Sequence, residues 1–370
     1  MRVILTGGGT GGHIYPAIAI GQALLKKNPY CKILYLGGQK GLENKLVPES
    51  GFPMKTLEVV GWERKISPQA LGAIWKAGKA YFMARKIIRD FQPDLIIGTG
   101  GYVCLPVVMA GAHWGCPTIL HEQNAFPGLT NRLLARWAKA ILLTFPEARN
   151  YFSAVFHDKI IVTGLPVRSL ILETVKEQGL KYFNFSPTKR TLLTLGGSRG
   201  AESINQAMVS VCSHFYGDSR LQIIHSTGEN GYQEFRENLL ARGIDLANNG
   251  NIMSIPYLKQ MEYALACADL CVARSGATFL AEMTAKGIPG ILVPYPYAAE
   301  GHQEHNARAL AKQGAAVVIL DQELNGEVLI KQLEDILFNQ EKLEKMASQS
   351  KQAGKPEALA TIISVLEKYL

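Results

Sequence analysis

The 370-residue sequence lacks the features that mark several classes of protein. Its six cysteines lie scattered in apolar runs without C-x-x-C spacing, which argues against a zinc site and against a disulfide framework. The first residues enter an apolar strand pattern without a charged segment followed by a long apolar core, so no signal peptide is expected. We therefore expect a cytoplasmic protein with buried thiols.

Long apolar runs without charge are also scarce. The one long segment without Lys, Arg, Asp or Glu, residues 102–120, is interrupted by two prolines and two glycines, which favours a short helix and a strand over a membrane span. No Asp-x-Asp pair occurs that could bind a divalent ion against a diphosphate. We therefore expect no strict requirement for a metal.

The length and composition fit a globular protein of two domains. The length suits two domains of roughly 150 residues each, and 47% hydrophobic with 19% charged residues is ordinary globular composition. The net charge of +8 suggests an anionic partner: a nucleotide ligand, an acidic membrane surface or nucleic acid. Nucleic acid is disfavoured because no basic and aromatic RNA-binding motif occurs among the strand patterns.

The stretch Thr6–His13, TGGGTGGH, lies between an apolar strand pattern and a helical pattern. Such a loop lets backbone N–H groups approach an anionic or highly oxygenated ligand, and the helix start adds its positive dipole end. A dinucleotide site would need an acid after the second strand, where Gly37 and Gly38 stand instead. A P-loop would need Lys where His13 stands, so both of these readings are excluded.

The order of strand, small-residue loop and helix recurs along the chain. It is repeated at residues 94–112, 191–212 and 269–285, and a Gly-Pro hinge at 164–168 separates the first half from the second. The polar residues 121–124 follow another buried strand, although Ala125 excludes an H-E-x-x-H zinc motif. We therefore expect two parallel-sheet α/β domains with ligands at the carboxyl ends of their strands.

Two further patterns allow more than one reading. The helical pattern over 68–90, with Trp62 before it and Trp75 within it, combines aromatic and basic residues. It suits an acidic bilayer surface, and equally a crossover helix whose aromatic side chains pack on the sheet. His302 and His305 allow a metal site, but polar residues after a strand are more commonly contacts to a ligand.

Together these motifs resemble the MurG family, the peptidoglycan N-acetylglucosaminyltransferases that convert lipid I to lipid II. In chain order, the similar motifs are Gly8–His13, Gly100–Val103, His121–Asn124, Pro166–Arg168, Gly196–Ser198, Arg274–Ala277, and His302 and Gln303 with Asn306. The resemblance implies an α/β fold of the GT-B type, in which two Rossmann-like parallel-sheet domains face each other across a cleft.

The resemblance also implies a division of labour between the domains. Residues 1–165 would form an acceptor and membrane-side domain, residues 166–354 a UDP-GlcNAc-binding domain, and a helix of about 355–370 would pack back on the first. Arg168 would meet phosphate oxygens, Glu282 would accept from ribose hydroxyls, and the helix beginning near Ala277 would hold the diphosphate. The implied substrate-binding residues are Thr10, Gly11, Gly12, Asn124, Arg168, Ser198, Leu258, Ala277, Thr278, Phe279, Leu280, Ala281, Glu282 and Gln303.

Because the family inverts the anomeric centre, a base must remove the proton of the acceptor 4-hydroxyl. His13 is the first candidate, since an imidazole pKa of about 6.5 suits proton removal near neutral pH, and Glu122 is its competitor. No cofactor and no metal are expected.

Two alternative functions stay open. One is another GT-B enzyme of UDP-sugars, such as a glycolipid glycosyltransferase or a UDP-GlcNAc epimerase, and the other is a non-catalytic protein of the cell-wall or division machinery.

The resemblance implies a set of partners and a location. The partners are UDP-GlcNAc, the undecaprenyl-linked lipid I, an anionic membrane surface and other cell-wall or division proteins, with no nucleic acid among them. The location is peripheral, on the cytoplasmic face of the bacterial plasma membrane.

Overall fold

The structure is a computed structural model that describes residues 1–59, 68–197, 200–246 and 251–370, with side chains of the first long helix described only from residue 77. Trp62, Ser198 and the side chain of Trp75 lie outside this description. Contacts divide the chain into unit 1, Met1–Pro166 with Glu357–Leu370, and unit 2, Val167–Pro356.

Unit 1 is built on a seven-stranded sheet in the order β3-β2-β1-β4-β5-β6-β7, with each neighbouring pair parallel. The apolar runs explain the strands, because a parallel sheet covered on both faces buries both sets of side chains. The strands are β1 Arg2–Thr6, β2 Lys32–Gly38, β3 Met54–Leu57, β4 Leu95–Gly98, β5 Thr118–Glu122, β6 Ala140–Leu143 and β7 Ile160–Val162.

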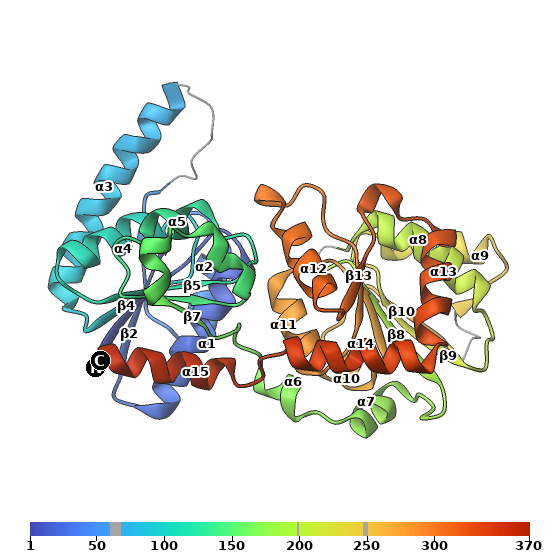
Figure 1. Cartoon of the computed structure of the whole chain (residues 1–370). Helices are drawn as coiled ribbons and strands as arrows, with labels where there is room; N and C mark the ends of the chain where they lie inside the picture. Colours follow the sequence, from blue (N-terminus) through green and yellow to red (C-terminus); the bar gives the residue numbers. More distant parts are fainter. Residues whose placement is uncertain (60–67, 198–199, 247–250) are drawn as a thin grey trace. The chain divides into compact units, whose positions relative to one another are not determined.

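Helices cover both faces of this sheet (Figure 1). Val3 and Leu5 point to the face covered by α1 and α15, whereas Ile4 points to the face covered by α3 and α4, as strand alternation requires. The helices of unit 1 are α1 Gly11–Lys27, α2 Glu43–Glu49, α3 Pro68–Phe91, α4 Cys104–His113, α5 Leu129–Leu134 and α15 Ala358–Leu366, with 3₁₀ turns at η1 Pro146–Tyr151, η2 Ala154–Lys159 and η6 Glu367–Tyr369.

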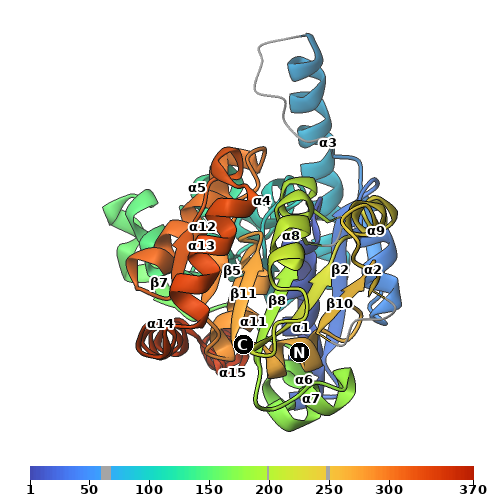
Figure 2. The same ribbon diagram turned by 90° about the vertical axis from the view of Figure 1, so that its right-hand side faces the viewer.

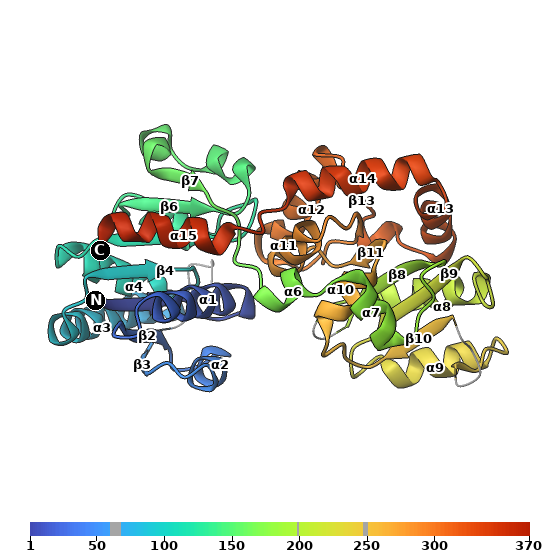
Figure 3. The same ribbon diagram turned by 90° about the horizontal axis from the view of Figure 1, so that it is seen from below.

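The C-terminal helix α15 belongs to unit 1, although nearly two hundred residues of unit 2 precede it. It lies beside α1 (Figure 3) and contributes Ile362 and Leu366 to the core on that face of the sheet. An ion pair between Lys27 and Glu367 joins the ends of the two helices.

Unit 2 repeats the design with a six-stranded parallel sheet in the order β10-β9-β8-β11-β12-β13 (Figure 2). A core cluster of this unit packs α8, α9 and α13 against the strands. The strands are β8 Arg190–Leu195, β9 Leu221–Ser226, β10 Ile252–Ile255, β11 Leu270–Ala273, β12 Gly290–Leu292 and β13 Ala316–Val318. The helices are α6 Ser169–Glu173, α7 Lys176–Phe183, α8 Glu202–His214, α9 Tyr232–Leu240, α10 Met261–Cys267, α11 Ala277–Ala285, α12 His302–Lys312, α13 Gly326–Leu337 and α14 Gln340–Ala353, with 3₁₀ turns at η4 Ala299–Gly301 and η5 Asp321–Glu323.

In both units the strand order reverses beside the first strand, between β1 and β4 and between β8 and β11. Doubly wound sheets bind ligands at this switch point, outside the carboxyl ends of the strands. The expected glycine loops follow β1, β4 and β8, so the topology brings them to these edges. Within the described ranges, no helix has the length and apolar character needed to cross a membrane.

Truncating the buried face of α15 should destabilise unit 1. We expect Leu366→Ala to lower the free energy of unfolding by about 2–5 kcal/mol, because Leu366 is fully buried and its loss creates a cavity. All four tryptophans lie in the sequence of unit 1, at residues 62, 75, 114 and 137, so tryptophan fluorescence during urea unfolding measures this change. The exposed neighbour Ser364→Ala is the control, and equal effects of the two substitutions would contradict the packing described.

Candidate active site

The first glycine loop of unit 1 packs against the loop that follows β4. Gly8 N–H donates to the carbonyl oxygen of Gly100 at 3.3 Å. A Cβ atom at Gly101 would lie 2.3 Å from the carbonyl oxygen of Gly8, so only glycine permits this approach. Gly9 has a φ of 87°, a left-handed conformation that glycine adopts without strain. The expected residues Thr10, Gly11 and Gly12 close this loop at the start of α1, and all three are at least partly exposed.

His13 lies in the first turn of α1, with its ring against both glycine loops. Its Nδ1 is 3.1 Å from the carbonyl oxygen of Gly8, and a Cβ atom at Gly100 would lie 2.9 Å from the ring carbon Cδ2. A carbonyl oxygen only accepts hydrogen bonds, so Nδ1 carries the proton in this contact and Nε2 is the basic nitrogen. The backbone is fixed as well, because Thr99 Oγ1 donates to the carbonyl oxygen of His13 at 2.7 Å.

Glu122 lies at the end of β5 and organises the loop that follows it. One carboxylate oxygen accepts from the backbone and side-chain N–H groups of Asn124, at 3.0 and 3.4 Å. The other accepts from Gly128 N–H at 3.1 Å and from Asn131 Nδ2 at 2.8 Å. Burial raises the pKa of this carboxyl, and the hydrogen bonds partly offset that rise. Glu122 and Asn124, both expected at the site, are therefore bound to each other.

His121 and Gln123, which flank Glu122, are buried in unit 1. His121 Nε2 is 3.0 Å from the carbonyl oxygen of Gly164, so it carries the proton there. Nδ1 then accepts from Gln123 Nε2 at 3.1 Å. Burial lowers the pKa of His121 to about 4. This histidine is therefore neutral at physiological pH and serves the packing of the strand end.

In unit 2, a cavity of about 680 Å³ lies at the carboxyl ends of β8, β11 and β12. Among the expected donor-binding residues that the structure describes, Phe279 and Gln303 line it. Arg274 also lines it and donates to Asp321 Oδ1 at 2.5 Å and to Ser203 Oγ at 3.2 Å. The other lining residues are Leu195, Gly196, Gly197, Gly200, Ala201, Glu202, Gln206, Gly276, Tyr295, Pro296 and Tyr297.

The start of α11 is tied to the start of α12 beside this cavity. Ser275 Oγ donates to the carbonyl oxygen of Gln303 at 2.7 Å, and Gln303 Oε1 accepts from Tyr295 N–H at 3.0 Å. Of the expected run along α11, Ala277, Leu280 and Glu282 are buried, whereas Thr278, Phe279 and Ala281 are partly exposed. Leu258 is buried between β10 and α10, and Ser198 lies outside the described residues.

Arg168 and Glu282, expected to bind different parts of the donor, bind each other. Arg168 Nε donates to Glu282 Oε1 at 2.6 Å, and Arg168 Nη2 donates to Oε2 at 3.0 Å. The side chain of Glu282 is buried and that of Arg168 is more than half exposed. This two-bond geometry fixes the direction of both side chains, and each carboxylate oxygen keeps a further lone pair for a ligand hydroxyl.

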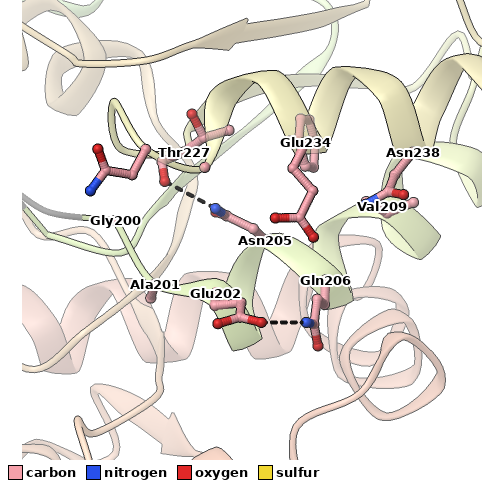
Figure 4. A pocket seen from close by; sticks show the side chains of 12 residues that line it. Gly200, Ala201, Glu202, Asn205, Gln206, Val209, Thr227, Glu234 and Asn238 are labelled. Atoms are coloured by element: carbon pink, nitrogen blue, oxygen red, sulfur yellow. Dashed lines mark hydrogen bonds between the residues drawn. The ribbon is translucent and has the colours of Figure 1, made fainter.

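A second cavity of unit 2, of about 190 Å³, lies between α8 and α9 (Figure 4). Asn205 points from α8 to the loop after β9, where its Nδ2 donates to the carbonyl oxygen of Thr227 at 3.0 Å. Glu202 and Gln206 are hydrogen-bonded to each other along its edge. None of the expected site residues lines this cavity.

Sequence reasoning missed two acids that hold these loops, Glu43 in unit 1 and Asp321 in unit 2. Arg274 after a buried strand was a signal that some carboxylate must face it, but no spacing identified Asp321. Glu43 had no comparable signal, since its partners are backbone N–H groups. Among the described residues, no group of three or more His, Cys, Asp or Glu side chains could hold a metal ion.

Two parallel-sheet α/β units with loops gathered at their switch points define a GT-B fold. Comparison with protein families identifies the glycosyltransferase family 28 N-terminal domain over residues 3–143 and its C-terminal domain over 191–362. The chain is 51% identical over 370 residues to the UDP-N-acetylglucosamine--N-acetylmuramyl-(pentapeptide) pyrophosphoryl-undecaprenol N-acetylglucosamine transferase of Desulforamulus reducens, covering 100% of this chain and 99% of that protein. The transferase of the same name from Halothermothrix orenii is 48% identical, with 99% and 98% covered.

Solved structures agree with this assignment. The crystal structure of MurG from Acinetobacter baumannii matches with a TM-score of 0.80 and 27% identity, covering 99% of each chain. The UDP-GlcNAc 2-epimerase of Neisseria meningitidis shares the fold, with a TM-score of 0.69, 16% identity and 100% of each chain covered. The chain belongs to the MurG family of N-acetylglucosaminyltransferases, within glycosyltransferase family 28.

The buried, neutral His121 should make unit 1 sensitive to mild acid. The pKa of His121 is about 4 in the folded state, whereas a solvent-exposed histidine of the unfolded chain has a pKa of 6.5. The unfolded chain therefore binds the proton more readily. Its contribution to stability is therefore full above about pH 6.5 and is lost as the pH falls towards 4. We expect a loss of roughly 3 kcal/mol from this group by pH 4.

Urea unfolding between pH 4 and 7, followed by tryptophan fluorescence, measures this loss. His121→Gln keeps a side-chain donor for the Gly164 carbonyl oxygen but does not titrate in this range. We expect the variant to show a shallower pH dependence than the parent, and parallel curves would contradict the assignment.

Proposed function

We propose that the chain carries out its reaction with His13 of unit 1 as the general base and with unit 2 holding the donor. The reaction is the transfer of N-acetylglucosamine from UDP-N-acetylglucosamine to lipid I, which forms lipid II. This reaction is supported by a sequence identity of about one half to relatives named for it, over their full length. The hydrogen bond between His13 Nδ1 and the Gly8 carbonyl oxygen is the observation that carries the assignment of the base.

Transfer with inversion requires the acceptor 4-hydroxyl to attack the anomeric carbon from the face opposite UDP while a base takes its proton. With Nδ1 protonated, Nε2 of His13 is the nitrogen that can accept this proton. His13 is also partly exposed at the carboxyl edge of the sheet, where an acceptor can reach it. These features suit an imidazole that works as a base near neutral pH.

Glu122 is a weaker candidate for the base, although it stands on the same sheet edge. The residue is 2% exposed, and its two carboxylate oxygens together accept four hydrogen bonds from N–H groups. A carboxylate so occupied is poorly placed to take a proton from a substrate hydroxyl. We assign Glu122 to positioning Asn124 and the loop before α5.

In unit 2 we assign the donor to the cavity lined by Phe279 and Gln303. Glu282 lies on the same helix as Phe279, α11, and binds Arg168. The exposed guanidinium of Arg168 can meet diphosphate oxygens while it stays bonded to Glu282. The backbone N–H groups at the start of α11 add the positive end of a nine-residue helix dipole. Together they supply charge for the departing diphosphate without a metal ion.

For the lipid-linked acceptor we propose a membrane-facing surface at the end of α3, on the cytoplasmic face of the plasma membrane. Phe82, which is 68% exposed, lies with Trp114, Arg85, Lys86 and Arg89 around one shallow hollow. Apolar rings beside three cations suit an interface with anionic lipid. The aromatic residues first expected there, Trp62 and Trp75, fall outside the described side chains.

The base assignment predicts a selective loss of turnover. We expect His13→Ala to lower kcat by about 10²–10⁴-fold, the usual cost of losing a general base, with UDP-GlcNAc binding near normal because unit 2 is intact. Steady-state kinetics with a lipid I analogue and calorimetry with UDP-GlcNAc test both parts. Near-normal turnover of His13→Ala, beside a Glu122→Gln enzyme that binds donor but does not turn over, would move the role to Glu122.

The surface on α3 predicts binding that depends on charge and salt. Each basic residue near an anionic surface contributes about 1 kcal/mol, so Arg85→Glu with Lys86→Glu should lower retention on anionic vesicles at least tenfold. High salt should lower retention of the parent protein too. The matched control is Lys26→Glu with Lys32→Glu, two exposed lysines of the same unit. Equal loss in both pairs would show that only net charge matters and would reject this surface.

A further inference from the structure

A buried carboxylate lies directly beneath the first glycine loop of unit 1. Glu43, the first residue of α2, is fully buried. Its Oε2 accepts from Gly9 N–H at 3.1 Å and its Oε1 accepts from Gly38 N–H at 3.1 Å. Within the described part of the chain, these backbone N–H groups and no cationic side chain bind its charge. Burying a carboxylate in this way is costly, which calls for an explanation.

The glycines around Glu43 are the ones that its side chain requires. A Cβ atom would lie 2.6 Å from Oε1 at Gly8, 2.9 Å from Cγ at Gly37 and 2.3 Å from Oε2 at Gly41. The pair Gly37 and Gly38 stands where a dinucleotide-binding sheet would place its ribose-binding acid. Here the acid enters from the following helix and turns towards the glycine loop.

Glu43 and His13 bind the two ends of a single peptide group. The Gly8 carbonyl oxygen and the Gly9 N–H belong to the same planar peptide bond, which is trans, so they point in opposite directions. His13 Nδ1 is bound on the oxygen side at 3.1 Å, and Glu43 on the nitrogen side at 3.1 Å. Hydrogen bonds in such a chain polarise one another, so the carboxylate makes the Gly8 oxygen a stronger acceptor.

We propose that Glu43 is a positioning residue for His13, acting through the Gly8–Gly9 peptide group. The carboxylate orients and polarises this peptide, which holds the proton on Nδ1 and keeps Nε2 basic towards the acceptor hydroxyl. In carboxylate–histidine pairs of other enzymes the acid binds the imidazole directly, whereas here one peptide bond lies between them. The inference rests on the proposed role of His13 as the base.

The first test is a split between turnover and donor binding. Glu43→Gln keeps the shape of the side chain but offers one accepting oxygen for two N–H groups. We expect kcat to fall about 10- to 100-fold, as for a misplaced catalytic group, with the KM for UDP-GlcNAc within twofold of the parent. Glu49→Gln, an exposed acid on the same helix, is the control and should match the parent. An unchanged kcat in Glu43→Gln would overturn the proposal.

The second test is a double-mutant cycle with His13→Ala. If Glu43 acts through His13, adding Glu43→Gln to His13→Ala should change kcat less than twofold, because effects within one unit are not additive. An equal fall in both backgrounds would show that Glu43 acts independently of His13. If His13→Ala alone turns over normally, the assignment of His13 as the base is wrong. If His13→Ala is impaired but Glu43→Gln is not, only the role of Glu43 is wrong.

The third test reads the imidazole itself and does not depend on activity. In protein labelled with ¹⁵N in the histidine rings, the His13 signals, assigned by their loss in His13→Ala, should show a protonated Nδ1 in the parent. We expect this preference for a protonated Nδ1 to weaken in Glu43→Gln. If the unfolding midpoint shows that Glu43→Gln does not fold, Glu43→Asp takes its place. An unchanged tautomer in the folded variant would overturn the proposal.

Discussion

Parallel strands that end at the same edge of a sheet bring the loops after them into contact, and unit 1 depends on that contact at β1 and β4. The N–H of Gly8 meets the carbonyl oxygen of Gly100, and a side chain at Gly101 would strike the Gly8 peptide. Because no space remains for a Cβ atom, the two loops fix each other. His13 takes its orientation from both of them, so the candidate base is placed by backbone packing more than by its own helix.

The two units share a strand order but hold their glycine loops with different charges. In unit 1 the buried Glu43 binds the loop through N–H groups of its own chain. In unit 2 the cation Arg274 lines the cavity and pairs with Asp321, and the exposed side chain of Arg168 binds Glu282. A cavity with cationic partners suits an anionic diphosphate, whereas a loop already bound to a carboxylate suits the orientation of a base. The shared fold therefore holds its glycine loops by different polar contacts in its two halves.

Buried polar side chains also fix the loop that follows β5 in unit 1. Glu122 gathers the N–H groups of Asn124, Gly128 and Asn131 and so shapes a loop that has no regular structure of its own. His121 stays neutral because burial lowers its pKa, and it joins β5 to the carbonyl oxygen of Gly164 near the end of the unit. These residues follow a strand, where the sequence predicts contacts to a ligand, and in the structure they also bind groups of unit 1 itself.

The sequence by itself determined the two α/β units, their glycine loops and the family, since apolar runs, small-residue loops and ordered motifs are local features that a reader can recognise. It also singled out His13 and Glu122 next to predicted strands and, through the family resemblance, Arg168 and Glu282. Only the tertiary structure decided that Arg168 pairs with Glu282, that Glu122 is occupied, and that Glu43 lies under the loop. The reason is physical, because every residue except proline carries a backbone N–H group. The residue type that donates to a carboxylate such as Glu43 therefore does not reveal the hydrogen bond, and only the folded chain shows it.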